Sequence, residues 1–180
     1  MDGIEGKIAR VELPDDQHAP FCSRIVGKAS LTQTQVFHNV FMPHRLHVYL
    51  IDDNVTDLEL AHEAFSGHAD EVRLTTCSSA ESALKSLMDP STPLPDVIVT
   101  DLNMPLMSGL ELLKVLKGES KLQCIPVVML TTSSDADDVK SAYALHASSY
   151  LVKAETFSTF MTQVDALVTF WMTTRRVHQA

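Results

Sequence analysis

The sequence lacks long apolar runs, an excess of basic residues and a paired set of cysteines. No apolar run approaches the ~18 residues of a membrane-spanning helix, and the N-terminus lacks the apolar core of a signal peptide. The chain has 14 Lys and Arg against 23 Asp and Glu, and this net charge of −9 argues against a nucleic-acid-binding face. Cys22, Cys77 and Cys124 are an odd number without metal-site spacing, which favours a reducing compartment. We therefore expect a cytoplasmic protein that binds neither nucleic acid nor membrane.

From about residue 46 the chain alternates short apolar runs with longer segments of helical period. The expected strands are 46–51, 71–77, 97–99, 126–130 and 150–152. The expected helices are 56–66, 78–89, 108–117, 135–145 and 156–174. Because continuous apolar strands alternate with amphipathic helices, a parallel sheet covered on both faces is indicated. The predicted fold class is α/β, with a flavodoxin-like doubly wound five-stranded parallel sheet of order 2-1-3-4-5.

Two of the expected helices begin with capping-box patterns, at Ser78–Glu81 and at Ser108–Glu111. Residues 1–44 do not join the strand–helix scheme and are expected to form a flexible N-terminal arm. The alternative is a partner-binding arm, whose apolar contacts would be Val36, Phe37, Val40 and Phe41. Residues 45–174 are then expected to form the single domain, and residues 175–180 a tail.

Polar residues fall at the ends of four expected strands: Asp52, Asp53, Asp101, Thr131 and Lys153. In a parallel sheet these positions converge on one edge. Three clustered carboxylates repel one another unless a cation is present, and hard oxygen ligands select Mg²⁺. A carboxylate can attack a phosphoryl group, while a metal ion and a lysine neutralise the transferring oxygens. Each residue alone has an ordinary alternative, such as a turn, a helix cap or a solvated charge, so the prediction rests on their joint occurrence.

Four segments resemble the motifs of response-regulator receiver domains of two-component systems. These segments are Val48–Asp53, Val99–Pro105, Val128–Thr131 and Ser149–Lys153. The resemblance covers roughly residues 46–172, and Gly109 also matches the loop of that family.

The resemblance implies a role for each polar residue. The implied catalytic residues are Asp101 as phosphoacceptor, with Lys153 and Thr131 contacting the phosphoryl group. The implied ligands of Mg²⁺ are Asp52, Asp53, Asp101 and the backbone carbonyl of Asn103. The implied switch pair is Thr131 and Tyr150.

The implied function is that of a stand-alone response regulator. It would accept a phosphoryl group on Asp101 from a sensor histidine kinase, in a Mg²⁺-dependent reaction, and signal through protein contacts. It would catalyse only its own phosphorylation and dephosphorylation. One alternative is a phosphate-independent receiver-like interaction module. Another is a phosphatase with an aspartate nucleophile, but Asn103 stands where such an enzyme has its general acid.

Two further segments, Leu130–Ser134 and Phe170-Trp171, resemble the small regulators paired with bacterial phytochromes. The implied kinase is then a phytochrome. One departure from the family is Ala154, which stands where receivers usually have proline after a cis bond. Since a cis bond before a non-proline residue costs ~3–4 kcal/mol, we expect a trans or a strained cis bond there, and a shifted start of the last helix.

The last expected helix carries an apolar stripe wider than the ~100° of a core-facing helix. The stripe consists of Phe157, Phe160, Met161, Val164, Leu167, Val168, Trp171 and Met172. Phe170 lies outside it, and only six residues follow Thr174, so we expect the output to be a protein contact. The predicted contact is a C2 homodimer through the fourth helix, fifth strand and fifth helix, with Phe157, Phe170 and Trp171 at the interface. The alternative is a buried terminal helix with one stray exposed phenylalanine.

Overall fold

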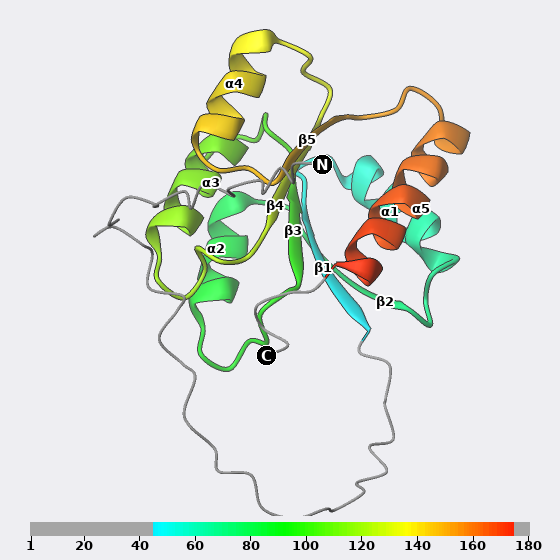
Figure 1. Cartoon of the computed structure of the whole chain (residues 1–180), viewed down its shortest axis with the longest axis horizontal. Coiled ribbons are helices and arrows are strands. Elements are labelled where there is room, and N and C mark those ends of the chain that lie inside the picture. The colour runs from blue at the N-terminus through cyan, green and yellow to red at the C-terminus, as the bar shows by residue number, and fades with distance from the viewer. Residues whose placement is uncertain (1–44, 175–180) are drawn as a thin grey trace, which may run out of the picture. The chain divides into compact units, whose positions relative to one another are not determined.

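The computed structural model describes residues 45–174, which Figure 1 draws in colour. The predictions of an N-terminal arm and a C-terminal tail concern residues 1–44 and 175–180, which lie outside the described residues. Within residues 45–174, no helix combines the length and the hydropathy that crossing a bilayer requires.

Five strands form one parallel sheet of order β2-β1-β3-β4-β5. The strands are β1 (Leu46–Ile51), β2 (Val72–Cys77), β3 (Val97–Thr100), β4 (Val127–Thr131) and β5 (Ser149–Val152). Every residue of β1, β3 and β4 is buried, because these strands are covered on both faces and flanked on both edges. The predicted fold class and strand order are confirmed.

Helices cover both faces of the sheet (Figure 1). The helices are α1 (Val55–Ser66), α2 (Ala80–Met88), α3 (Gly109–Gly118), α4 (Ala136–Ala144) and α5 (Phe157–Thr173). Two apolar clusters result. One lies under α2, α3 and α4, with Leu112 and Leu116 at its centre. The other lies under α1 and α5 and includes Val164 and Val168.

The structure confirms one of the two predicted capping boxes. Ser108 and Glu111 cap α3 reciprocally. The box predicted for α2 is wrong by one residue, since Ser79 is the N-cap and accepts a hydrogen bond from the N–H of Ser82. Ala80, Ala83 and Leu87 are buried, and this packing sets the register of the helix. Glu81 then lies two residues after the N-cap, whereas a capping box needs an acid three residues after it.

The connection between β5 and α5 differs from the one that a proline would give. Within residues 45–174 no peptide bond is cis, so the Lys153–Ala154 bond is trans. The N–H of Ala154 donates to Gln163 Oε1 at 3.1 Å, and Gln163 Nε2 donates to the carbonyl of Val152 at 2.8 Å. Since proline has no N–H, the alanine supplies a hydrogen bond that ties this connection to α5. Helix α5 then begins at Phe157, with Thr156 as N-cap.

Candidate functional site

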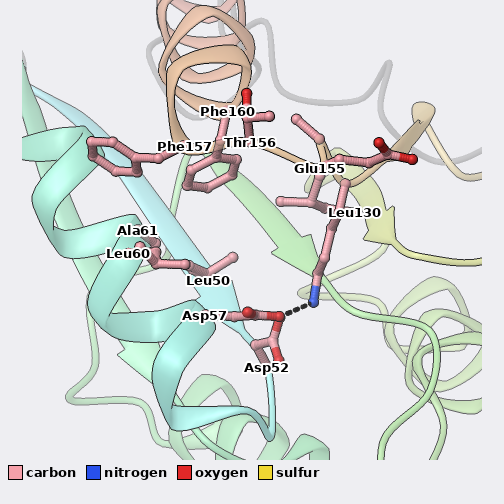
Figure 2. A pocket seen from close by; sticks show the side chains of 12 residues that line it. Leu50, Asp52, Asp57, Leu60, Ala61, Leu130, Glu155, Thr156, Phe157 and Phe160 are labelled. Carbon is pink, nitrogen blue, oxygen red and sulfur yellow. Dashed lines mark hydrogen bonds and ion pairs between the residues drawn. The ribbon is translucent and has the colours of Figure 1, made fainter.

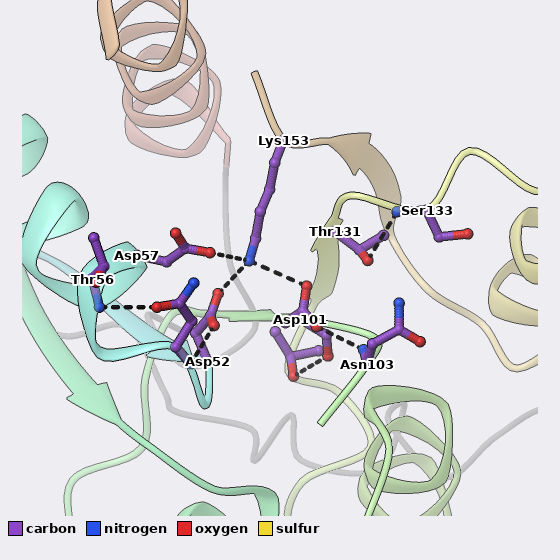
Figure 3. Close-up of polar contacts among 10 residues, drawn as sticks. Asp52, Thr56, Asp57, Asp101, Asn103, Thr131, Ser133 and Lys153 are labelled. Atoms are coloured by element: carbon purple, nitrogen blue, oxygen red, sulfur yellow. Dashed lines mark hydrogen bonds and ion pairs between the residues drawn. The ribbon is translucent and has the colours of Figure 1, made fainter. Parts of the chain in front are cut away.

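The candidate site lies at the carboxyl edge of the sheet, where Figure 3 shows side chains from four strand ends. Asp52 follows β1 and Asp101 follows β3, while Thr131 is the last residue of β4 and Lys153 follows β5. Because the strands are parallel, all four chain segments reach the same edge. Asp52, Asp101 and Thr131 are buried there.

Lys153 joins the site into one network. Its Nζ donates to Asp52 Oδ2 at 2.6 Å and to Asp57 Oδ2 at 2.7 Å, and it lies 3.3 Å from Asp101 Oδ1. The predicted convergence of Asp52, Asp101 and Lys153 on one edge of the sheet is observed, and in this structure they meet around the lysine ammonium.

The electrostatics of this cluster follow from its burial. Burial raises the pKa of the Asp52 carboxyl above its usual range, and repulsion from Asp101 adds to this. The hydrogen bonds from Lys153 and from the N–H of Asn54 oppose the increase. Burial disfavours the charged form of Lys153, but the hydrogen bonds to Asp52 and Asp57 outweigh it, so the pKa of this ammonium is raised above its usual range. The lysine therefore stays charged over the whole physiological range.

The backbone around Asp101 fixes its carboxylate. Asp101 Oδ2 accepts a hydrogen bond from the N–H of Asn103 at 2.6 Å. The N–H of Gly109 donates to the carbonyl of Leu102 at 2.8 Å, which brings the start of α3 against this strand end. A Cβ at position 109 would lie 2.1 Å from the carbonyl oxygen of Asp101. Only glycine fits this approach, so the loop that carries Asp101 depends on Gly109.

Thr131 and Tyr150 both contact the loop that follows β4. The N–H of Ser133 donates to Thr131 Oγ1 at 3.3 Å, and the Tyr150 hydroxyl donates to the carbonyl of Ser133 at 3.0 Å. Ser133 Oγ in turn donates to Asp138 Oδ2 at 2.6 Å, on the first turns of α4. The two residues predicted to act as a pair are thus connected through one intervening residue.

The oxygen donors of this edge suit a hard divalent cation. Asp53 and Asn103 are exposed, beside the buried Asp52 and Asp101. Within residues 45–174, no group of three or more His, Cys, Asp and Glu side chains is gathered closely enough to hold a metal ion. Mg²⁺ does not require such a group, because it retains several waters and takes one or two carboxylates. The carboxylates of Asp53 and Asp101 and the backbone carbonyl of Asn103 are oxygen donors of this kind, so the chemistry of the predicted ligands fits Mg²⁺.

A small cavity of about 110 Å³ adjoins the lysine, between α1 and the start of α5. Figure 2 shows Asp52 and Asp57 at one end of it and Leu50, Leu130 and Phe160 along its walls. The lining therefore combines the charged groups around Lys153 with an apolar wall.

Asp57 is the site residue that the sequence did not predict. It lies in the first turn of α1, where an acidic residue usually only complements the helix dipole. The available signal was its position one helical turn beyond Asn54, the N-cap of the helix that follows the Asp52-Asp53 pair. This placement turns its carboxylate toward the end of β5.

The residues predicted for an interface differ in exposure. Phe157 and Phe170 are exposed, whereas Trp171 is buried in the cluster under α5. The rings of Phe170 and Trp171 pack edge to face, with 5.0 Å between their centroids. A groove of about 290 Å³ runs between α5 and the edge strand β5, with Leu151, Leu167 and both rings in its lining.

Comparison with known proteins identifies relatives of this chain. The response regulator receiver domain family matches residues 48–165. Response regulator Rcp1 of Synechocystis sp. is 31% identical over 131 residues, which are 71% of this chain and 89% of that protein. The phosphorylated cyanobacterial phytochrome response regulator RcpA has a TM-score of 0.68 at 30% identity, over 73% of this chain and 96% of that one. The Mn²⁺-bound form of Rcp1 has a TM-score of 0.67 at 30% identity, over 72% and 96% of the two chains.

Proposed function

This chain belongs to the response regulator receiver domain family, and from that premise we propose that it is a stand-alone phosphorylation switch. Asp101 accepts a phosphoryl group from a sensor histidine kinase. The observation that carries the proposal is the position of the Lys153 ammonium, within 3.3 Å of Asp101 and 2.6 Å of Asp52. A buried carboxylate beside a fixed cation is the arrangement that phosphoryl transfer to aspartate needs.

In the proposed reaction, one carboxylate oxygen of Asp101 forms a bond to phosphorus. The P–N bond of the donor's phosphohistidine breaks, and the imidazole leaves with the electron pair. Lys153 and the hydroxyl of Thr131 donate to the phosphoryl oxygens as they arrive. Bound Mg²⁺ would neutralise part of the phosphoryl charge, as the Mn²⁺-bound relative suggests. The proposed ligands are Asp52, Asp53, Asp101 and the backbone carbonyl of Asn103.

The proposed output is a change in the loop after β4. Attraction of Thr131 to the phosphoryl group would move its hydroxyl away from the N–H of Ser133, and Tyr150, which donates to the carbonyl of Ser133, would respond. Helix α4, strand β5 and helix α5 would then carry the signal as a homodimer surface, with Phe157 and Phe170 exposed on it.

The proposed donor is a cytoplasmic histidine kinase of the phytochrome type. The relatives described as phytochrome response regulators support this assignment. The cytoplasm supplies both the ATP that such a kinase consumes and the free Mg²⁺ that the reaction requires. The protein would act as a signalling component and would turn over no substrate other than its own acyl phosphate.

The test is labelling with acetyl phosphate and Mg²⁺, followed by intact mass. The native chain should gain one phosphoryl group, and Asp101→Asn should gain none, because an amide cannot form the acyl phosphate. The matched control is Asp137→Asn, which removes an exposed acid in the first turn of α4 and should leave the gain intact. Labelling of Asp101→Asn would overturn the assignment, and a native chain that takes no label would favour the phosphate-independent module.

A further inference from the structure

The Lys153 ammonium has three N–H donors and three carboxylate neighbours, but its distances to the three carboxylates are unequal. The distances to Asp52 and Asp57 are 2.6 and 2.7 Å, whereas the distance to Asp101 is 3.3 Å. The first two are in the range of short charge-assisted hydrogen bonds, and the third is longer than that range. The ammonium is therefore drawn toward α1, away from the proposed phosphoacceptor.

We propose that Asp57 is a positioning residue that holds Lys153 on the α1 side of the site until a phosphoryl group is attached to Asp101. The inference rests on the proposed function, and it adds a competitor for the lysine. Asp57 and the phosphoryl oxygens are alternative acceptors for the same N–H. The carboxylate of Asp57 therefore favours the unphosphorylated state.

The burial of the two carboxylates decides whether Lys153 gives up Asp52 or Asp57 when a phosphoryl group arrives. The Asp52 side chain is 4% exposed, and the Asp57 side chain is 30% exposed. A buried carboxylate that loses its partner keeps the full cost of desolvation, whereas a partly exposed one can be rehydrated. When Lys153 turns toward a phosphoryl group, it should keep Asp52 and release Asp57.

The charge of Asp57 has a second consequence, of opposite sign. Its carboxylate adds a negative charge beside Asp52 and so increases the attraction of the site for a divalent cation. Removing that charge should weaken Mg²⁺ binding. The same change frees an N–H of Lys153 and should strengthen the binding of an anion at Asp101. An acid that only stabilised the first turn of α1 would not shift the two ligands in opposite directions.

The experiment compares Asp57→Asn with the native chain, using Mg²⁺ alone and then beryllofluoride at saturating Mg²⁺, each by isothermal titration calorimetry. We expect the Kd for Mg²⁺ to rise, because one negative charge near the site is lost. The Kd for beryllofluoride should fall by about tenfold, the effect of one charge-assisted hydrogen bond. Asp57→Glu, which keeps the carboxylate, should move both values back toward the native ones. Asp137→Asn is the control, because it removes a first-turn acid of α4 that contacts only Lys140 in the described part of the chain.

A direct readout of the lysine separates this inference from the proposed function. In the unphosphorylated native chain, the ¹⁵Nζ resonance of Lys153 should show slow proton exchange, and Asp57→Asn should accelerate that exchange. Unchanged exchange in Asp57→Asn, or weaker binding of both ligands, would overturn the role of Asp57. A native chain that shows the protected lysine but takes no label from acetyl phosphate would refute the phosphorylation proposal and leave the Asp57–Lys153 contact standing.

Discussion

The centre of the sheet and its β5–α5 side contribute to the same site but differ in how firmly they are held. Strands β1, β3 and β4 are buried at every residue. Strand β5 is at most half-buried, and its last residue, Val152, is exposed. The centre carries Asp52, Asp101 and Thr131, whereas the side carries Lys153 and Tyr150.

This difference assigns the two regions to different tasks. Asp52 and Asp101 follow strands with no exposed residue, where packing leaves little room for the backbone to move. The lysine and the tyrosine come from an edge strand, where local rearrangement costs less. In the proposed switch, the acceptor would stay rigid, and Lys153 and Tyr150 would move at the periphery. The predictions below test that division, beginning with the largest expected effect.

The β5–α5 side still contributes to stability through the buried face of α5, whose largest side chain is Trp171. Trp171 is 7% exposed and packs in the cluster under α5. Because it loses a large buried ring, Trp171→Ala should lower the free energy of unfolding by about 3–5 kcal/mol. Urea unfolding followed by far-ultraviolet circular dichroism measures this.

Phe170, which precedes Trp171 on α5, provides the matched control for Trp171→Ala. Phe170 is 59% exposed, and its ring packs at a right angle to the Trp171 ring. Phe170→Ala should change the free energy of unfolding by about 0.5 kcal/mol or less, and it should weaken the proposed homodimer in light scattering. A larger loss of stability from Phe170→Ala than from Trp171→Ala would contradict the assignment of inner and outer faces to α5.

At the centre of the sheet, a single added methyl group should lower both the stability and the rate of labelling. Gly109→Ala would place a Cβ against the backbone of Asp101 and Leu102, and no flexible side chain is present to yield. The free energy of unfolding should fall by about 1–3 kcal/mol. Labelling by acetyl phosphate should also slow, because the Asp101 carbonyl must shift.

Gly118 provides the control within the same helix. A Cβ there meets no atom within 4 Å, so Gly118→Ala should leave labelling unchanged and raise the free energy of unfolding by about 0.4–1 kcal/mol. If both alanine variants kept native stability and labelling, the centre would be more adaptable than its burial indicates.

The strand order and three members of the charged cluster were predictable because they depend on patterns along the chain. Short apolar runs locate most of the strands, and parallel pairing then brings Asp52, Asp101 and Lys153 to one edge. The roles of these residues in phosphoryl transfer and metal binding are still predictions, as are the switch pair and the interface residues.

The features that could not be predicted depend on contacts across the fold. Asp57 meets Lys153 across 96 positions, and its place one helical turn beyond Asn54 does not by itself identify that partner. The register of α2 was set by packing rather than by its cap pattern, and the partner of the Ala154 N–H is a glutamine on α5. Backbone conformation in the loop after Asp101 was equally hidden, because leucine does not indicate a left-handed position.

The smallest predicted effect is for a substitution in the loop after Asp101. This loop lies between the buried centre of the sheet and the solvent. Leu106 has φ 67°, and it is 95% exposed, so its side chain gains little packing to offset a conformation that L-residues disfavour. Leu106→Asn should raise the free energy of unfolding by about 1 kcal/mol, since asparagine tolerates this conformation. His146→Asn is the matched control, because His146 has φ 65° and histidine already tolerates it, so little change is expected. A loss of stability in Leu106→Asn would show that the leucine packs against the domain, and the rigid centre would then extend to the tip of this loop.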